Sequence, residues 1–274
     1  TIATRVPTHE PWPYHNLGVE NSVQFGTTEQ GELTGNLKDQ VDKKLPEKQI
    51  TESDFANAPD PRSSVGSLDT DQVKGLVAQR AKEVDQDLDA VSVEKGLGKY
   101  GIKAEQLEQS GYLKPGTVSK YLKDPNSTVT DGFGNQTTQL ESVLNNTNVW
   151  TDKEGANSLT TFLRDDGQQA MALEDLYNVN LSELVSKGVV KGTEVAKDLG
   201  ALIQSSTVHG SDNVEQWSKG GGNAMINSGI EQTARNSQYS VNLVDTKLTD
   251  LTKSFSNPGA FAGTTDRDLL DSDI

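Results

Sequence analysis

Three acidic residues are the first candidates for chemistry in this sequence. Asp165 and Asp166 are adjacent, and Glu174 follows on the same segment. A pair of carboxyl groups can cleave a glycosidic bond, one acting as general acid and the other as base or nucleophile. The chain holds 40 acidic residues, however, so neighbouring carboxylates are expected on any solvated face. We therefore interpret these three residues as surface or structural groups.

Two of the three histidines suggest a metal site near the amino end. His9 and His15 lie close together, and Glu10 follows His9 directly. A zinc site needs ligands held on a stiff frame, and no further cluster of Asp, Cys or His completes this set. The sequence thus favours a structural role for these residues, and we expect neither a bound metal nor another cofactor.

The third histidine, His209, has the other two residue types of a catalytic triad nearby. Ser206 and Asp212 flank it within one short segment. Residues this close in sequence rarely adopt the geometry of a triad, so we do not expect one. The sequence also lacks the G-x-S-x-G, H-E-x-x-H and phosphate-loop motifs. We therefore predict a protein that is not an enzyme.

A calcium loop is a further weak possibility. Asp131, Gly132, Gly134 and Asn135 provide oxygen ligands and flexible glycines. The alternating acidic order and the terminal glutamate of an EF-hand loop are missing. We interpret this segment as an ordinary loop, which we expect to run from 124 to 135.

The composition limits the classes of partner. The chain has 274 residues, a formal net charge of −15 and no cysteine. Such an acidic chain gains nothing from releasing phosphate counterions, so we expect no nucleic-acid partner. No run of apolar residues is long enough to cross a bilayer. The first residue is Thr1, so we expect a processed chain or a fragment of a longer one.

One stretch of the chain recurs 77 positions later. Tyr100 to Leu122 reads YGIKAEQLEQSGYLKPGTVSKYL, and Tyr177 to Leu199 reads YNVNLSELVSKGVVKGTEVAKDL. The matched positions are mostly apolar or glycine, which indicates two copies of one helical module. In each copy we predict a short helix, over 103–110 and 182–187, that ends at Gly111 or Gly188. A second helix follows, capped by Thr117 in the first copy.

These modules predict a mainly α protein with three regions. We expect a proline-containing extended arm and polar linker over 1–66, and a flexible tail over 256–274. Between them we expect a small multi-helix body over 67–255, with the repeat at 97–124 and 174–201. Its first helix is capped by Asp69 or Thr70, and its apolar seam runs through Val77, Val84 and Val91. Other helices are expected over 138–145, 155–163, 168–177, 224–238 and 241–255.

The polar linker over 19–65 has too few apolar residues for a core of its own. We expect it to be extended or disordered, either as a floppy tether or lying along a neighbouring subunit.

Five residues are candidates for docking on a partner. Val6, Trp12 and Tyr14 lie in a proline-stiffened segment with little core, so these side chains should pack on another surface. Lys114 and Lys191 occupy equivalent positions of the two copies, beside the turns. They could bind an acidic partner or a glycan. The alternative, which we favour, is that they are solvated or complement a helix carboxyl end.

Two stretches of the chain resemble bacteriophage virion proteins. TRVPTHEPWPYHNL, from Thr4 to Leu17, resembles a segment of virion proteins of contractile-tailed phages of cyanobacteria. The first copy of the module, followed by SVLNNTNVW at 142–150, resembles helical regions of baseplate hub or spike proteins. The resemblance covers 4–17 and about 97–163. It implies a tail baseplate component near the membrane-piercing spike.

This resemblance leads to three hypotheses. The leading one is a non-enzymatic structural protein of the virion, which contacts other tail proteins and forms a homo-oligomer there. The second is a tail-associated peptidoglycan hydrolase, since hubs of this kind can carry such a domain; no matching catalytic residues are present, so that activity is not carried over. The third is a module that binds cell wall or glycan through its two copies.

Overall fold

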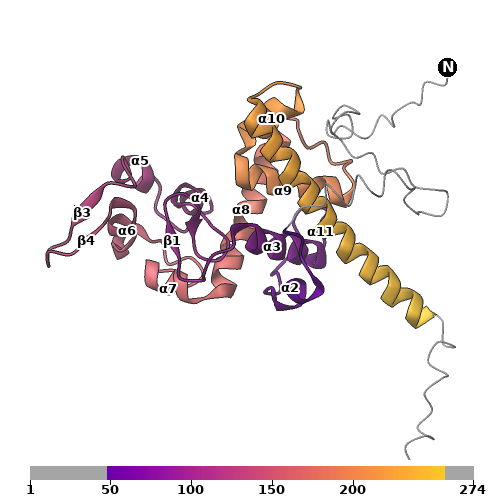
Figure 1. Ribbon diagram of the computed structural model, residues 1–274, viewed down its shortest axis with the longest axis horizontal. Helices are drawn as coiled ribbons and strands as arrows, with labels where there is room; N and C mark the ends of the chain where they lie inside the picture. Colours follow the sequence, from indigo (N-terminus) through magenta and orange to yellow (C-terminus); the bar gives the residue numbers. More distant parts are fainter. Residues whose placement is uncertain (1–47, 257–274) are drawn as a thin grey trace, which may run out of the picture.

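The computed structural model describes residues 48–256, with side chains through 246. The protein is mainly α-helical, and the described part contains ten α-helices and two small two-stranded sheets. Figure 1 shows an elongated body in which α8 lies between two groups of elements. We call the group over residues 85–165 the loop-rich half. We call α3, α9, α10 and α11 the helical half.

The helical half packs around α9. Its elements are α3 (Thr70–Val84), α9 (Ala196–His209), α10 (Ser211–Ser218) and α11 (Ala224–Ser256). The long helix α11 lies across both α9 and α3. Gly200 permits this approach, because a Cβ atom there would lie 3.0 Å from Val241 Cγ2. As predicted, Asp69 caps α3, where its side chain accepts a hydrogen bond from the Gln72 amide.

Short elements joined by turns form the loop-rich half. They are β1 (Val91–Ser92), β2 (Gly96–Leu97), α4 (Ala104–Gln109), α5 (Thr117–Tyr121), β3 (Thr128–Thr130), β4 (Gln136–Thr138), α6 (Gln139–Leu144), the 3-10 helix η2 (Thr147–Val149) and α7 (Leu159–Arg164). Tyr112, Trp150 and Phe162 pack together at its centre, and the indole Nε1 of Trp150 donates to the Leu144 carbonyl over 2.8 Å. An aromatic cluster thus replaces the long helices that organise the other half.

Helix α8 (Asp166–Ser186) joins the two halves. Gln169 on α8 is fully buried, and both the oxygen and the nitrogen of its carboxamide form hydrogen bonds. Its Oε1 accepts from the Lys99 amide over 2.9 Å, while Nε2 donates to the carbonyls of Leu88 and Phe162. Further along α8, the Tyr177 hydroxyl donates to Gln204 of α9 over 2.8 Å. One helix therefore makes buried polar contacts with both halves.

The two helix ends of the repeat have the same backbone geometry. Gly111 follows α4 with φ of 83°, and Gly188 follows α8 with φ of 69°. At the first site the amides of residues 112 and 113 donate to the Leu107 carbonyl. At the second, those of 189 and 190 donate to Leu184. Both ends therefore close the helix with the same left-handed turn, as the matched glycines predict.

The helices on either side of these turns differ in length. The predicted helix over 182–187 is the last part of α8, which has 21 residues, whereas α4 has six. Thr117 is the first residue of α5 rather than its cap, because Gly116 occupies the cap position. In the second copy, α9 begins at Ala196 after an extended Val195. The two copies are thus alike in their turns and in their packed apolar positions, but not in the lengths of their helices.

The predicted linker is wrong for residues 48–65. Helix α2 (Glu52–Asn57) forms there with a capping box at Thr51, and Ile50, Ala58 and Val65 are buried. Ile50 and Ala58 pack with Ala78 of α3, and Lys82 of α3 pairs with Asp54 over 3.1 Å. Residues 1–47 and 257–274 lie outside the described part of the chain.

Several predicted boundaries are also wrong. Helix α3 ends at Val84 because Asp85 adopts a left-handed conformation, so Val91 lies in β1. The expected loop over 124–135 contains β3, which pairs with β4 as an antiparallel hairpin. The two helices predicted over 224–255 form the single helix α11, since nothing near 239 breaks it.

Replacing Gly111 or Gly188 with alanine should destabilise the protein by about 1–2 kcal/mol, the cost of the left-handed conformation for a residue with a Cβ atom. Urea unfolding of each variant measures this loss. Gly132 is the matched control, since its φ is not positive and a Cβ there meets nothing within 4 Å. Gly132→Ala should be neutral or slightly stabilising. Equal effects at all three glycines would contradict the assignment.

Candidate functional site

Structural partners engage each of the three candidate catalytic carboxylates. Asp165 caps α8, where its side chain accepts from the Gln168 amide. Asp166 accepts from the Tyr100 hydroxyl over 2.5 Å and from Lys99 Nζ over 2.7 Å. Glu174 is 3% exposed and accepts the Arg62 backbone amide over 3.1 Å. These contacts support the structural interpretation of the three residues.

Arg62 is the centre of a charged cluster beside Glu174. Its guanidinium contacts Glu154 Oε1 at 2.7 Å and Asp175 Oδ1 at 2.8 Å. Lys153 Nζ lies 2.9 Å from the other oxygen of Asp175. The cluster fastens the segment before α3 and the loop around residue 154 to α8. Of the three candidate carboxylates, only Glu174 borders this cluster, with Arg62 Nε 3.8 Å from its Oε2.

The sequence analysis expects no catalytic triad from Ser206, His209 and Asp212, and the structure places these three side chains against different neighbours. His209 packs against α11, with Nε2 3.0 Å from the Thr233 hydroxyl, and burial lowers the pKa of its imidazole. Asp212 is exposed and pairs with Lys187. Ser206 is buried, and its hydroxyl has no hydrogen-bond partner within the described part of the chain. This arrangement positions no base beside the serine hydroxyl.

The glycine-rich segment around Asp131 is the tip of the β3–β4 hairpin. The Asp131 carboxylate accepts from the amides of Phe133 and Asn135 and from the Asn135 side chain. These hydrogen bonds lower the pKa of its carboxyl group. The oxygens that a calcium ion would need are used to hold the turn. Across residues 48–246, no group of three or more acidic or histidine side chains could hold a metal ion.

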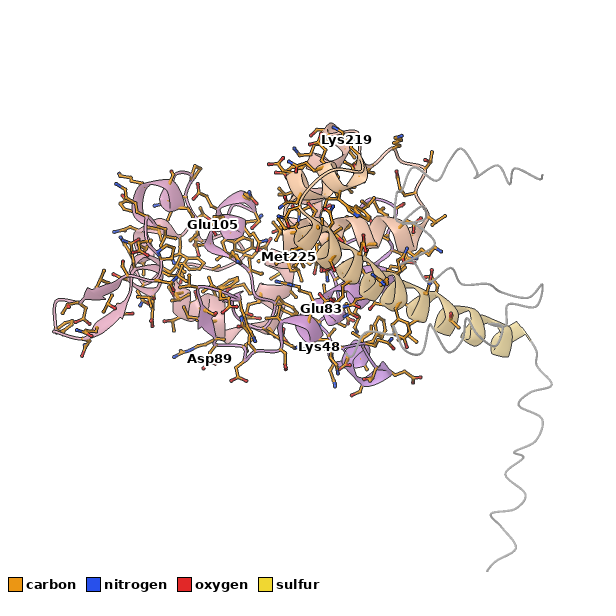
Figure 2. The ribbon with its side chains drawn as sticks, turned by 45° about the horizontal axis from the view of Figure 1, so that its top comes forward. Lys48, Glu83, Asp89, Glu105, Lys219 and Met225 are labelled. Atoms are coloured by element: carbon orange, nitrogen blue, oxygen red, sulfur yellow. The ribbon has the colours of Figure 1, made fainter. Side chains whose placement is uncertain are left out.

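The hairpin tip carries the most exposed large apolar side chain among the described residues. Phe133 is 93% exposed and lies between Gly132 and Gly134. Figures 1 and 2 both show the hairpin standing away from the rest of the body. Sequence reasoning missed this feature because it interpreted 124–135 as a loop. An aromatic residue between two glycines was the available signal.

The structure describes only two of the five predicted docking residues, Lys114 and Lys191. Val6, Trp12 and Tyr14 lie outside the described residues, as do His9 and His15. Lys114 and Lys191 are both exposed, and each follows the left-handed turn of its copy. The Lys114 amide donates to the Val149 carbonyl, and the Lys191 amide to Glu194. The two lysines thus project from turns whose backbones are held in place.

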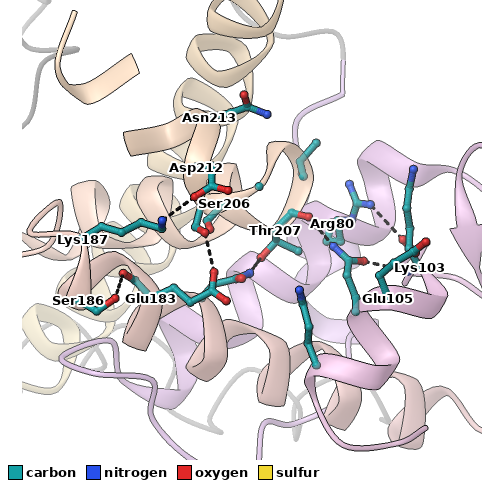
Figure 3. Close-up of a pocket in the computed structure, with 17 residues that line it drawn as sticks. Arg80, Lys103, Glu105, Glu183, Ser186, Lys187, Ser206, Thr207, Asp212 and Asn213 are labelled. Atoms are coloured by element: carbon teal, nitrogen blue, oxygen red, sulfur yellow. Dashed lines mark hydrogen bonds and ion pairs between the residues drawn. The ribbon is translucent and has the colours of Figure 1, made fainter. Parts of the chain in front are cut away.

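A polar cavity of about 660 Å³ lies where α4, α8, α9 and α10 meet. Figure 3 shows α8 residues such as Glu183 and Lys187 on one side, and Lys103 and Glu105 on the other. The volume lies within the range of about 300–1,000 Å³ for small-molecule sites. Its lining is dominated by amides, hydroxyls and ion pairs, so a ligand here must offer hydrogen bonds.

The cavity lies between the two copies of the repeat. Gln106 and Gln109 line it from the first copy, and Glu183 and Ser186, 77 positions later, line it from the second. Lys103 and Asn180 form a third equivalent pair. The same helix face of each copy thus faces one space. The constant offset of the repeat is the sequence signal for this pairing, because it aligns polar as well as apolar positions.

Comparison with known proteins gives no relative. No protein-family model, no curated protein and no solved structure matches this chain. Within the described residues, no helix is both long and apolar enough to cross a membrane.

The buried carboxyl of Glu174 should make stability depend on pH. Burial raises its pKa, and the contacts with Arg62 offset this only in part. The folded protein therefore keeps this proton at pH values where the unfolded chain has lost it. The contribution of Glu174 to the free energy of unfolding must then fall as pH rises from the ordinary glutamate range through the folded-state pKa.

Glu174→Gln removes that titration and can still accept the Arg62 amide. Urea unfolding at about pH 4 and about pH 7 should show the variant gaining stability relative to the parent at the higher pH. A relative stability that is the same at both pH values would mean that the carboxyl is not perturbed.

Proposed function

We propose that this chain is a structural component of a bacteriophage tail, in the baseplate hub or spike region, and that it acts through protein–protein contacts. The proposal rests first on the two stretches that resemble virion proteins. The second of them, about 97–163, covers most of the loop-rich half, including α4, the hairpin and the aromatic cluster. In the virion we expect the chain to contact other tail proteins and copies of itself.

The observation that supports this proposal most is the projecting hairpin. Phe133 is exposed at its tip, and the Asp131 carboxylate fixes the turn through three hydrogen bonds. An aromatic side chain on a preformed turn loses little conformational freedom on binding, and such residues dominate the binding energy of many interfaces. A hairpin this short has no core to which the phenyl ring could contribute. Protein contact is the role that fits.

The two other hypotheses are supported to different degrees. The partners of Asp165, Asp166 and Glu174 weigh against a hydrolase that uses them. The binding-module hypothesis is favoured by the polar cavity between the two copies. Binding in that cavity is compatible with a place in the virion, since the hairpin and the cavity are formed by different residues.

The location is tested on purified particles of the phage that encodes the chain. Peptide mass spectrometry should detect the chain in the virion, and gold-labelled antibodies should mark the baseplate end of the tail. Absence of its peptides from particles that contain other tail proteins would overturn the proposal, and so would labelling confined to the head.

Phe133→Ser should impair assembly without affecting the fold. The side chain is almost fully exposed, so the thermal midpoint of the purified variant should match that of the parent. Incorporation into particles, in a phage complemented with the variant, should fall severalfold.

Met225→Ser is the matched control, since Met225 is also largely exposed but lies at the start of α11 in the helical half. Incorporation of this variant should be unchanged. Normal incorporation of Phe133→Ser would rule out the hairpin tip as a contact.

A further inference from the structure

The hairpin of β3 and β4 is a sheet of two strands, so within the described part of the chain no further strand covers its outer edges. Figures 1 and 2 show that it stands away from the body. A two-stranded hairpin is marginally stable in water, and three or more strands give a sheet independent stability. The backbone at such an edge can accept another strand by hydrogen bonding.

The register of the hairpin decides which backbone groups of β3 face outward. Two hydrogen bonds set the phase of the ladder, one from the Asp131 amide to the Asn135 carbonyl and one from the Gln139 amide to the Ser127 carbonyl. In an antiparallel ladder, residues bonded to the partner strand alternate with residues whose amide and carbonyl point away from it. Val129, opposite Thr137, therefore bonds to β4. The amides and carbonyls of Thr128 and Thr130 point to the outer edge.

The residues of β3 leave this edge exposed. Edge strands are commonly protected by charged side chains or proline, whereas β3 reads Thr-Val-Thr and both threonines are exposed. In the other sheet, Leu97 of β2 exchanges two backbone hydrogen bonds with Ile102. On β4 the last residue, Thr138, caps α6, so the chain leaves the sheet there. The outer edge of β3 is thus the one best suited to receive a strand.

The sequence of β3 is symmetric about Val129. If two copies of β3 pair antiparallel across a two-fold axis, Thr128 of one lies opposite Thr130 of the other, and the two Val129 residues face each other. Each strand then offers the outward amides and carbonyls that the other needs, giving about four hydrogen bonds. Threonine pairs across strands are favourable. Between 125 and 140 the sole charged residue is Asp131, so the repulsion between two acidic chains is small here.

We propose that β3 pairs with β3 of a second copy of this chain, which gives a four-stranded antiparallel sheet across a two-fold axis. The proposal deepens the proposed function, which expects contacts between copies. The two are tested separately, because the pairing is measured on the purified chain and the location on phage particles. The interface is small and both chains carry a net charge of −15, so a dissociation constant on the order of 1 mM is expected.

A single cysteine tests the register directly, because the chain has none of its own. Val129→Cys places a thiol at the two-fold axis, where the Cα atoms of a non-hydrogen-bonded pair lie about 4.5 Å apart, within the reach of a disulfide. Thr137→Cys is the matched control, since it lies opposite Val129 on β4 and is also partly exposed.

Both variants are oxidised mildly at about 0.5 mM protein, in about 0.5 M salt to screen the repulsion between the chains. Val129→Cys should form disulfide-linked dimers about tenfold faster than Thr137→Cys, because pairing raises the local thiol concentration. Equal rates would overturn the proposal.

Proline on the outer edge separates pairing from chance collision. Proline is tolerated on an edge strand where its missing amide would face outward, so Thr130→Pro should keep the hairpin and remove one outward donor. Added to Val129→Cys, it should slow dimer formation to the rate of the Thr137→Cys control. Gln136→Pro, the corresponding change on β4 opposite Thr130, should leave the rate unchanged. Full-rate dimer formation with Thr130→Pro would contradict the pairing.

Hydrogen exchange of the unaltered chain gives a test that needs no variant. The amides of Thr128 and Thr130 should exchange about twofold more slowly at about 1 mM protein than at about 0.05 mM, as the expected dissociation constant implies. The amide of Lys120, on α5 outside the pairing, should exchange equally at both concentrations. Exchange at Thr128 and Thr130 that is independent of concentration would overturn the proposal.

Discussion

The buried carboxamide of Gln169 is the interaction on which the arrangement of the two halves depends. It satisfies the amide of Lys99 and the carbonyls of Leu88 and Phe162, which no helix or strand ladder pairs. Buried backbone groups without partners are costly, so these turns can be buried against α8 only while Gln169 is present. Because the loop-rich half has few regular elements, it takes its shape from side chains of this helix. The Arg62 cluster acts in the same way further along α8.

This arrangement explains why the two copies of the repeat share their turns and their apolar positions. Each copy ends a helix with a left-handed glycine and then packs apolar residues against the body. In the first copy the helix has six residues and depends on its surroundings, whereas in the second it is the end of α8. Placing both on one frame brings the same polar face of each copy to one cavity. The turns are structural, and the polar residues that precede each turn line the cavity.

The sequence predicted the features that depend on local chemistry. Asp69 caps α3, and Gly111 and Gly188 end their helices, because the caps and turns of a helix are decided by nearby residues. It did not predict the burial of Gln169, whose partners are far away in sequence. The fold of 48–65 was missed for the same reason, since the apolar and charged groups that its residues contact lie on α3 and α8. The cavity follows from how the copies are placed in space, which sequence spacing alone does not fix.

Hydrogen exchange on Gln169→Leu tests most directly whether α8 orders the loop-rich half. Leucine fills a similar volume but leaves the Lys99 amide and two carbonyls without partners. The account predicts that amides between residues 88 and 102 lose protection by about fivefold or more, as expected for about 1–3 kcal/mol, while α9 and α11 keep theirs. Unchanged protection at Lys99, or an equal loss throughout the helical half, would contradict it.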